Sequence, residues 1–67
     1  MAEQPDLLAA WTAANQACRD RAQVVGVRNC DDDPEWRALE QAANAAHEAA
    51  RAAGHTYDEL REAGRPA

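Results

Sequence analysis

Apolar residues recur every three or four positions in the second half of the chain, and this spacing constrains the fold most strongly. The residues are Trp36, Leu39, Ala43, Ala46, Ala50 and Ala53. Such spacing is the a/d pattern of a helix that packs along another helix. Asp33 followed by Pro34 is a typical helix start, and Gly54 is a typical helix end. We therefore predict a helix over about 34–53.

A second long helix is predicted over about 5–25. Its apolar or small positions follow the same helical spacing and are Leu7, Trp11, Ala14, Cys18, Ala22 and Val25. Pro5 suits the first helical position, and Asp6 would then lie in the first turn. Gly26 suits a left-handed helix end, from which Val27 would pack back onto Ala22.

A short third helix is predicted over about 57–63, because Thr56 and Glu59 have the spacing of a capping box. The two long helices have nearly equal lengths and a short connecting loop, which favours an antiparallel hairpin. We therefore expect an all-α fold, with residues 1–67 forming one small domain. Trp36 is expected to pack against Val24, Val25 and Val27 at the loop end. At the open end the expected neighbours are Leu7, Leu8, Trp11, Ala50, Ala53, Tyr57 and Leu60.

The net charge of the chain limits its partners. Twelve acidic residues against seven arginines give a formal charge of −5, which disfavours direct nucleic-acid binding. No apolar run approaches the roughly 20 residues of a membrane-spanning helix. The N-terminal sequence MAEQPDLL lacks the positive charge and apolar stretch of a signal peptide, so we expect a cytoplasmic protein.

Cys18 and Cys30 are the first candidates for chemistry. Cys18 lies on the apolar stripe and Cys30 in the loop, so a disulfide would require the loop to fold back beside the hairpin. Separate thiols and a disulfide therefore both remain open, with thiols favoured in a reducing compartment. The spacing of these cysteines from His47 and His55 matches no zinc pattern. We interpret His47 as a solvated residue of the polar face and His55 as a residue near a helix end.

The acidic run Asp31-Asp32-Asp33 does not have the ligand pattern of a calcium-binding loop and is better explained by helix capping. The sequence contains neither serine nor lysine, and a two-helix scaffold offers little concave volume for a substrate. We therefore expect no cofactor, no metal and no catalytic residue.

The segment from Ala49 to Gly64, AARAAGHTYDELREAG, resembles the first two helices of some bacterial helix-turn-helix domains. The resemblance covers an alanine-rich helix, a glycine and a capped short helix. The given sequence ends at Ala67, where the recognition helix of such a domain would begin, so we do not expect DNA reading.

Three functions fit these features. The first is a non-catalytic protein-interaction module that forms a homodimer or docks on a partner protein. Its expected surface comprises Trp11, Trp36, Leu39, Ala43, Ala46, Ala50 and Ala53, because large aromatic residues contribute strongly to interfaces. The alternative is a small acidic regulator or inhibitor that occupies a basic, nucleic-acid-binding site of its partner. The third is a redox or metal switch that uses Cys18 and Cys30.

Overall fold

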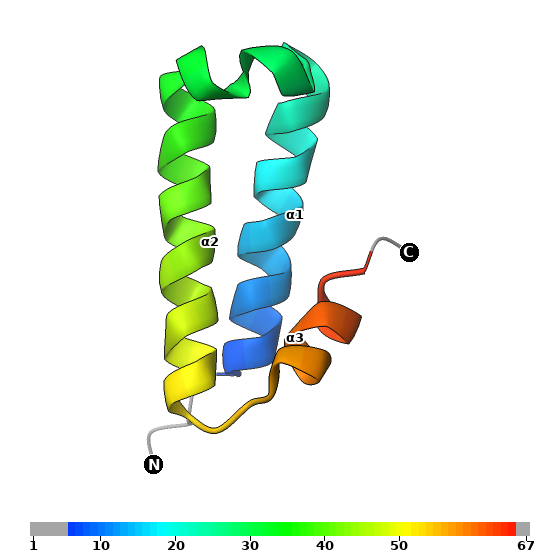
Figure 1. The fold of residues 1–67 in the computed structure, drawn as a ribbon, viewed down its shortest axis with the longest axis vertical. Coiled ribbons are helices and arrows are strands. Elements are labelled where there is room, and N and C mark those ends of the chain that lie inside the picture. Colours follow the sequence, from blue (N-terminus) through cyan, green and yellow to red (C-terminus); the bar gives the residue numbers. More distant parts are fainter. Residues whose placement is uncertain (1–5, 66–67) are drawn as a thin grey trace.

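Two antiparallel helices form the body of the protein (Figure 1). The computed structural model describes residues 6–65 of the chain. Helix α1 spans Leu7–Val25, the 3₁₀ helix η1 spans Val27–Asp32, helix α2 spans Pro34–Ala52, and helix α3 spans Tyr57–Ala63. The described residues are 85% helical and contain no strand. The predicted all-α hairpin with a short third helix is therefore confirmed.

Helix α1 begins two residues later than predicted. Asp6 is the N-cap and accepts a hydrogen bond from the backbone N–H of Ala9 at 3.0 Å, so it does not lie in the first turn. The predicted role of Pro5 lies outside the described residues. At the other end, Gly26 has φ +86° and donates its N–H to the Ala22 carbonyl. Val27 does not pack back onto the helix, because it is 83% exposed.

The connection between the long helices is more regular than the predicted loop, since residues 27–32 form η1. Asp33 then caps α2 by accepting a 2.7 Å hydrogen bond from the Trp36 backbone N–H, and Pro34 occupies the first position. This start is the one that the sequence predicted. Helix α2 ends at Ala52, one residue short of the expected boundary, and Gly54 follows with φ +102°.

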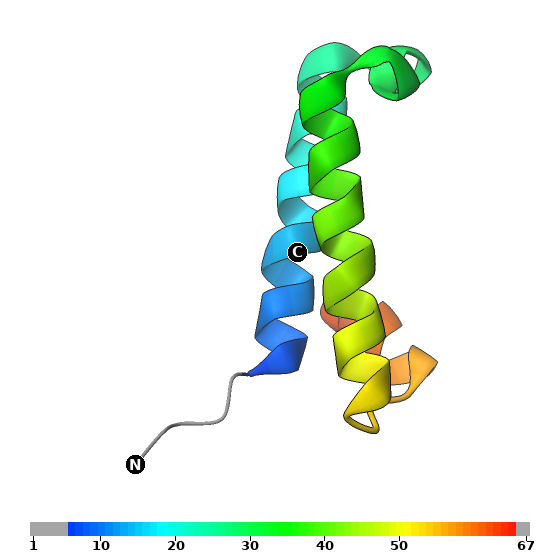
Figure 2. The same ribbon diagram turned by 90° about the vertical axis from the view of Figure 1, so that its left-hand side faces the viewer.

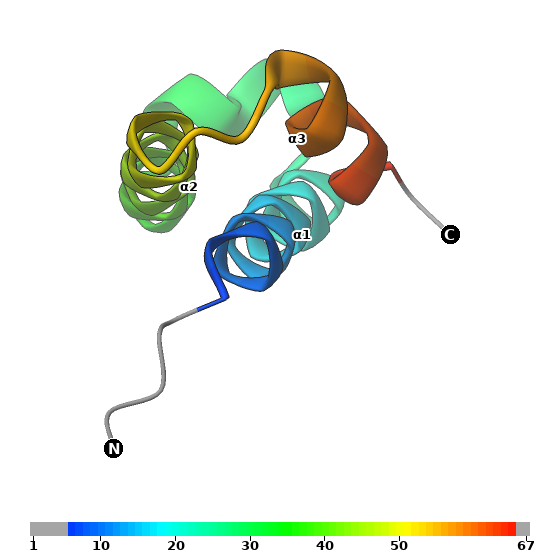
Figure 3. The same ribbon diagram turned by 90° about the horizontal axis from the view of Figure 1, so that it is seen from below.

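Helix α3 lies at the open end of the hairpin, where it forms a triangle with α1 and α2 (Figure 3). Its predicted capping box is present: Thr56 Oγ1 accepts from the Glu59 N–H, and Glu59 Oε1 accepts from the Thr56 N–H. Leu60 is 1% exposed and is the largest fully buried side chain of the described residues. The short helix therefore supplies the principal apolar residue of the core.

Alanine occupies the most buried positions of α2 in the contact between the long helices. Ala43 and Ala50 of α2 are buried, while Cys30 and Leu60 close the core at its two ends. Because alanine is small, two helices that meet through it can approach closely, toward the short end of the usual 8–10 Å range. The loop end differs from the prediction. Val24 is 75% exposed and Val27 is also exposed, so neither packs against Trp36 as expected.

Candidate protein-interaction surface

Each predicted interface residue now has a place in the hairpin. Ala43 and Ala50 are buried between the helices, so they belong to the core of this chain. Trp11, Trp36, Leu39 and Ala46 are half-buried, and Ala53 is exposed at the end of α2. The predicted stripe is therefore used mainly inside the chain, and its expected role as a contact surface stays a prediction.

Trp11 attaches α3 to the hairpin. Its indole Nε1–H donates to the Leu60 carbonyl at 2.9 Å, and its ring meets the His47 ring edge-on with centroids 5.1 Å apart. His47 also lies 5.7 Å from the Tyr57 ring, and the Arg51 guanidinium stacks over that ring at 4.0 Å. The interpretation of His47 as a solvated residue is wrong, because it packs between aromatic rings from α1 and α3.

Two further side chains of α1 bind the carboxyl end of α3. Asn15 Nδ2 donates to the Gly64 carbonyl at 3.2 Å, and the Thr12 hydroxyl lies 2.8 Å from the Leu8 carbonyl of its own helix and 3.1 Å from the Ala63 carbonyl, with one hydrogen to share between them. The last carbonyls of a helix have no partner within that helix, so the Asn15 amide satisfies a group that would otherwise need water. A β-carbon at Gly64 would lie 3.0 Å from Asn15 Nδ2 and 3.3 Å from Trp11 Nε1. The close approach of α1 therefore leaves little room for a side chain at this position.

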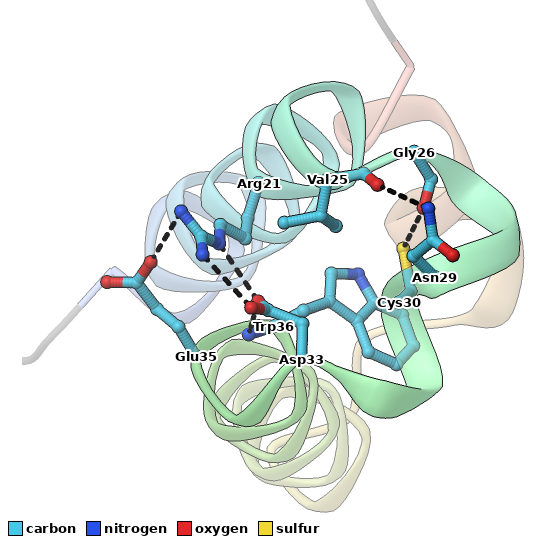
Figure 4. Close-up of polar contacts among 8 residues, drawn as sticks. All are labelled: Arg21, Val25, Gly26, Asn29, Cys30, Asp33, Glu35 and Trp36. Atoms are coloured by element: carbon cyan, nitrogen blue, oxygen red, sulfur yellow. Dashed lines mark hydrogen bonds and ion pairs between the residues drawn. The ribbon is translucent and has the colours of Figure 1, made fainter.

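A charged group joins the helices at the loop end (Figure 4). Arg21 donates from Nε and Nη2 to both carboxylate oxygens of Asp33, at 2.9 and 3.0 Å, and Nη1 lies 2.8 Å from Glu35 Oε2. The hydrogen bond from Arg21 and the Trp36 N–H lower the pKa of Asp33 below its ordinary value. Asp33 remains ionised at neutral pH, so it caps α2 and pairs with α1 at once.

The side of the hairpin away from α3 carries a different surface. Figure 2 shows that η1 and α3 both project from one side of the two long helices, and no described element covers the other. His47 and Arg51 of α2 face α3, as do Thr12 and Asn15 of α1. Helical geometry therefore places on the uncovered side the residues of each long helix that lie across the α1–α2 contact from these. Small residues predominate there: Ala10, Ala13, Ala17, Ala38, Ala42, Ala46 and Ala49. We call this set the alanine face.

The alanine face is largely exposed, and the acidic residues Asp6 and Asp20 lie in helical register with its α1 alanines. Ala10, Ala13, Ala38, Ala42 and Ala49 are exposed, and the other two alanines are half-buried. Arg21 and Glu35 share this side of the hairpin, where Arg21 pairs with both Glu35 and Asp33, so one negative charge of this group is not balanced. Of this face the sequence prediction named only Ala46, because a run of alanine with helical spacing also fits a solvated helix.

The chain shows no competing site in its described part. The residues from 6 to 65 enclose no pocket and bring no three His, Cys, Asp or Glu side chains together in a way that suits a metal ion. No helix among them is long and apolar enough to cross a membrane. Cys18 and Cys30 are both free thiols. Comparison with protein-family models, with curated proteins and with solved structures finds no match to this chain.

Proposed function

We propose that this chain is a non-catalytic, cytoplasmic protein-interaction module that docks through its alanine face. The observation that carries the proposal is the exposure of aligned alanines from two adjacent helices on a side that no described element covers. Small side chains allow a second pair of helices to approach at the short distances found in helical bundles. A second copy of the chain is the simplest such pair and would complete a four-helix bundle.

The charge distribution supports this assignment. Burying an unpaired charge in an interface costs on the order of several kcal/mol, so charged residues are depleted from interface centres. At one end of the alanine face Arg21 pairs with both Asp33 and Glu35. Arg51, His55 and Glu59 make their polar contacts at the opposite side or end of the hairpin. Docking would therefore bury alanine at the centre of the face, while Asp6 and Asp20 would lie at its margin.

The size of the surface sets the expected affinity. Each long helix has 19 residues and is therefore about 28 Å long. Two helices about 9 Å apart, each about 10 Å wide, span about 19 Å, so the face covers roughly 500 Å², or about 1,000 Å² for both partners. This is the lower limit for a specific interface. We therefore expect reversible association with a Kd on the order of micromolar, and not an obligate complex.

The test is sedimentation equilibrium over a wide range of concentrations. The mass of the wild-type chain should rise from 7.3 kDa toward twice that value. Ala42→Glu, which places a charge at the centre of the face, should keep the chain monomeric. Asn44→Glu is the matched control, because it adds the same charge to an exposed position of the same helix on another side. It should associate as the wild type does.

A wild-type chain that stays monomeric at millimolar concentration would refute self-association. Docking on another protein is then tested by affinity purification with the same three chains. A genuine partner should be retained by the wild type and by Asn44→Glu, and lost by Ala42→Glu. A partner that the Ala42→Glu variant still retains, but that is released at about 0.5 M salt, would instead support the acidic-regulator alternative, because salt screens exposed charges.

A further inference from the structure

The arginines of the chain are unevenly distributed over the hairpin. Six of the seven lie on the side from which η1 and α3 project, because they belong to these elements, follow them, contact them or lie in helical register with residues that do (Figure 2). These six are Arg19, Arg28, Arg37, Arg51, Arg61 and Arg65. Arg19, for example, lies one turn beyond Asn15, whose amide binds the carboxyl end of α3. Only Arg21 lies on the side of the alanine face.

Acidic residues border the alanine face without a matching number of arginines. Asp6 and Asp20 are exposed and lie one turn from alanines of the face in α1, while Asp33 and Glu35 share Arg21 at the loop end. We call these four acidic residues the acidic margin. Four acidic side chains against one arginine give this side a net charge of −3. The other seven described acidic residues face six arginines on the opposite side, which gives only −1 there.

The acidic margin opposes the docking of a second copy. Two copies that meet through the alanine face would bring two acidic margins together, and like charges that face each other across an interface oppose association. At about 0.1 M salt the Debye length is about 10 Å, which is close to the distance between packed helices, so this repulsion is only partly screened. The alanines at the centre therefore favour any closely packing pair of helices, whereas the margin disfavours an acidic one.

We propose that the preferred partner of the alanine face is a pair of helices whose own small-residue face is bordered by arginine or lysine, and not a second copy of this chain. This inference rests on the proposed docking function and adds the choice of partner. Small residues at the centre set how closely the helices approach. Charges at the margin set which partner is accepted, as the flanking charges of coiled coils do, because they attract one partner and repel another.

The chain itself supplies a probe with the required chemistry. In the basic-margin variant, Asp20→Arg and Gln41→Arg place two arginines at exposed positions, each one turn from an alanine of the face. The control variant, Asn44→Arg with Glu48→Arg, makes the same change in total charge at exposed positions of α2. Both control positions lie one turn from residues that face α3, so the added charge is outside the proposed interface. The helical circular dichroism of both variants should match that of the wild type.

The experiment titrates wild-type chain, labelled with a dye at its N-terminal amine, with each unlabelled chain at about 0.1 M salt and follows fluorescence anisotropy. The basic-margin variant should bind the labelled chain about tenfold more tightly than unlabelled wild type does, since a few charge pairs replace repulsions. The control variant should bind within about twofold of the wild type. As salt rises to about 0.5 M, self-association of the wild type should strengthen and binding of the basic-margin variant should weaken, because screening removes both effects.

Three outcomes would overturn the choice of partner. The basic-margin variant could bind no more tightly than the wild type, the control variant could bind as tightly as the basic-margin variant, or self-association of the wild type could weaken as salt rises. The salt response of the wild type requires no variant, so it tests the inference even if a variant unfolds. In all three outcomes the wild type still self-associates, and the docking proposal stands. If no pair of chains associates, the docking proposal fails together with the choice of partner.

Discussion

Replacing Leu60 with alanine tests whether the short third helix holds this small core together. Leu60 is 1% exposed, so the change removes three carbons from a fully buried position. At about 0.8 kcal/mol for each carbon, the lost burial is about 2.4 kcal/mol, and the cavity left behind brings the total to about 3–4 kcal/mol. A domain of this length has a total stability of about 3–10 kcal/mol. Leu60→Ala should therefore remove a large share of it.

The assay is urea denaturation followed by helical circular dichroism, with the midpoint and slope compared between variants. Val27→Ala is the control, because it also removes apolar carbons but from a side chain that is 83% exposed. Its free energy of unfolding should change by less than about 0.5 kcal/mol. The reasoning is refuted if the Leu60→Ala and Val27→Ala variants unfold at the same urea concentration, since Leu60 would then contribute no more than a surface residue.

Two further predictions concern the contacts that join the helices. The lowered pKa of Asp33 means that its contribution to stability is present above its unfolded-state pKa and is lost as pH falls through its folded-state value. The Asp33→Asn variant should thus melt at a lower temperature than the wild type at pH 7, and this difference should shrink in acid. An equal difference in melting temperature at both pH values would contradict the pairing of Asp33 with Arg21. Gly64→Ala should weaken α3 docking by about 1–2 kcal/mol, because the new carbon would crowd Asn15 and Trp11. Faster amide exchange confined to residues 57–65 would verify this effect, and unchanged exchange there would argue against it.

The features that the sequence predicts correctly are those decided by neighbouring residues. Asp33 and Pro34 start α2, and Thr56 and Glu59 start α3, because a cap depends on a side chain and a backbone N–H two or three positions away. The 3-4 spacing of α2 likewise requires only the geometry of one helix. These local rules were sufficient to give the hairpin and its boundaries to within two residues.

Contacts between distant segments were not predictable in the same way. Asn15, in α1, reaches a carbonyl 49 positions later in the chain, and nothing near it in sequence marks it as a partner of α3. His47 was misinterpreted for a related reason. It lies next to the predicted apolar stripe, but histidine is a polar residue type and was therefore assigned to the solvent. Its partial burial depends on Trp11 and Tyr57, which belong to other helices.

The alanine content explains why the fold and the proposed docking surface have the same origin. Alanine is the residue most favourable to helix formation, yet it buries little area. It therefore stabilises each helix more than it stabilises the packing between helices. This chain has 18 alanines, and only Ala43 and Ala50 among the described ones are buried. Helices built this way present similar small-residue rows on more than one side. One row of α2 packs against α1. The alanine face carries another row of small residues with similar spacing. A second hairpin could therefore dock there by the same geometry, which is why a single charge at Ala42 is expected to prevent association without unfolding the chain.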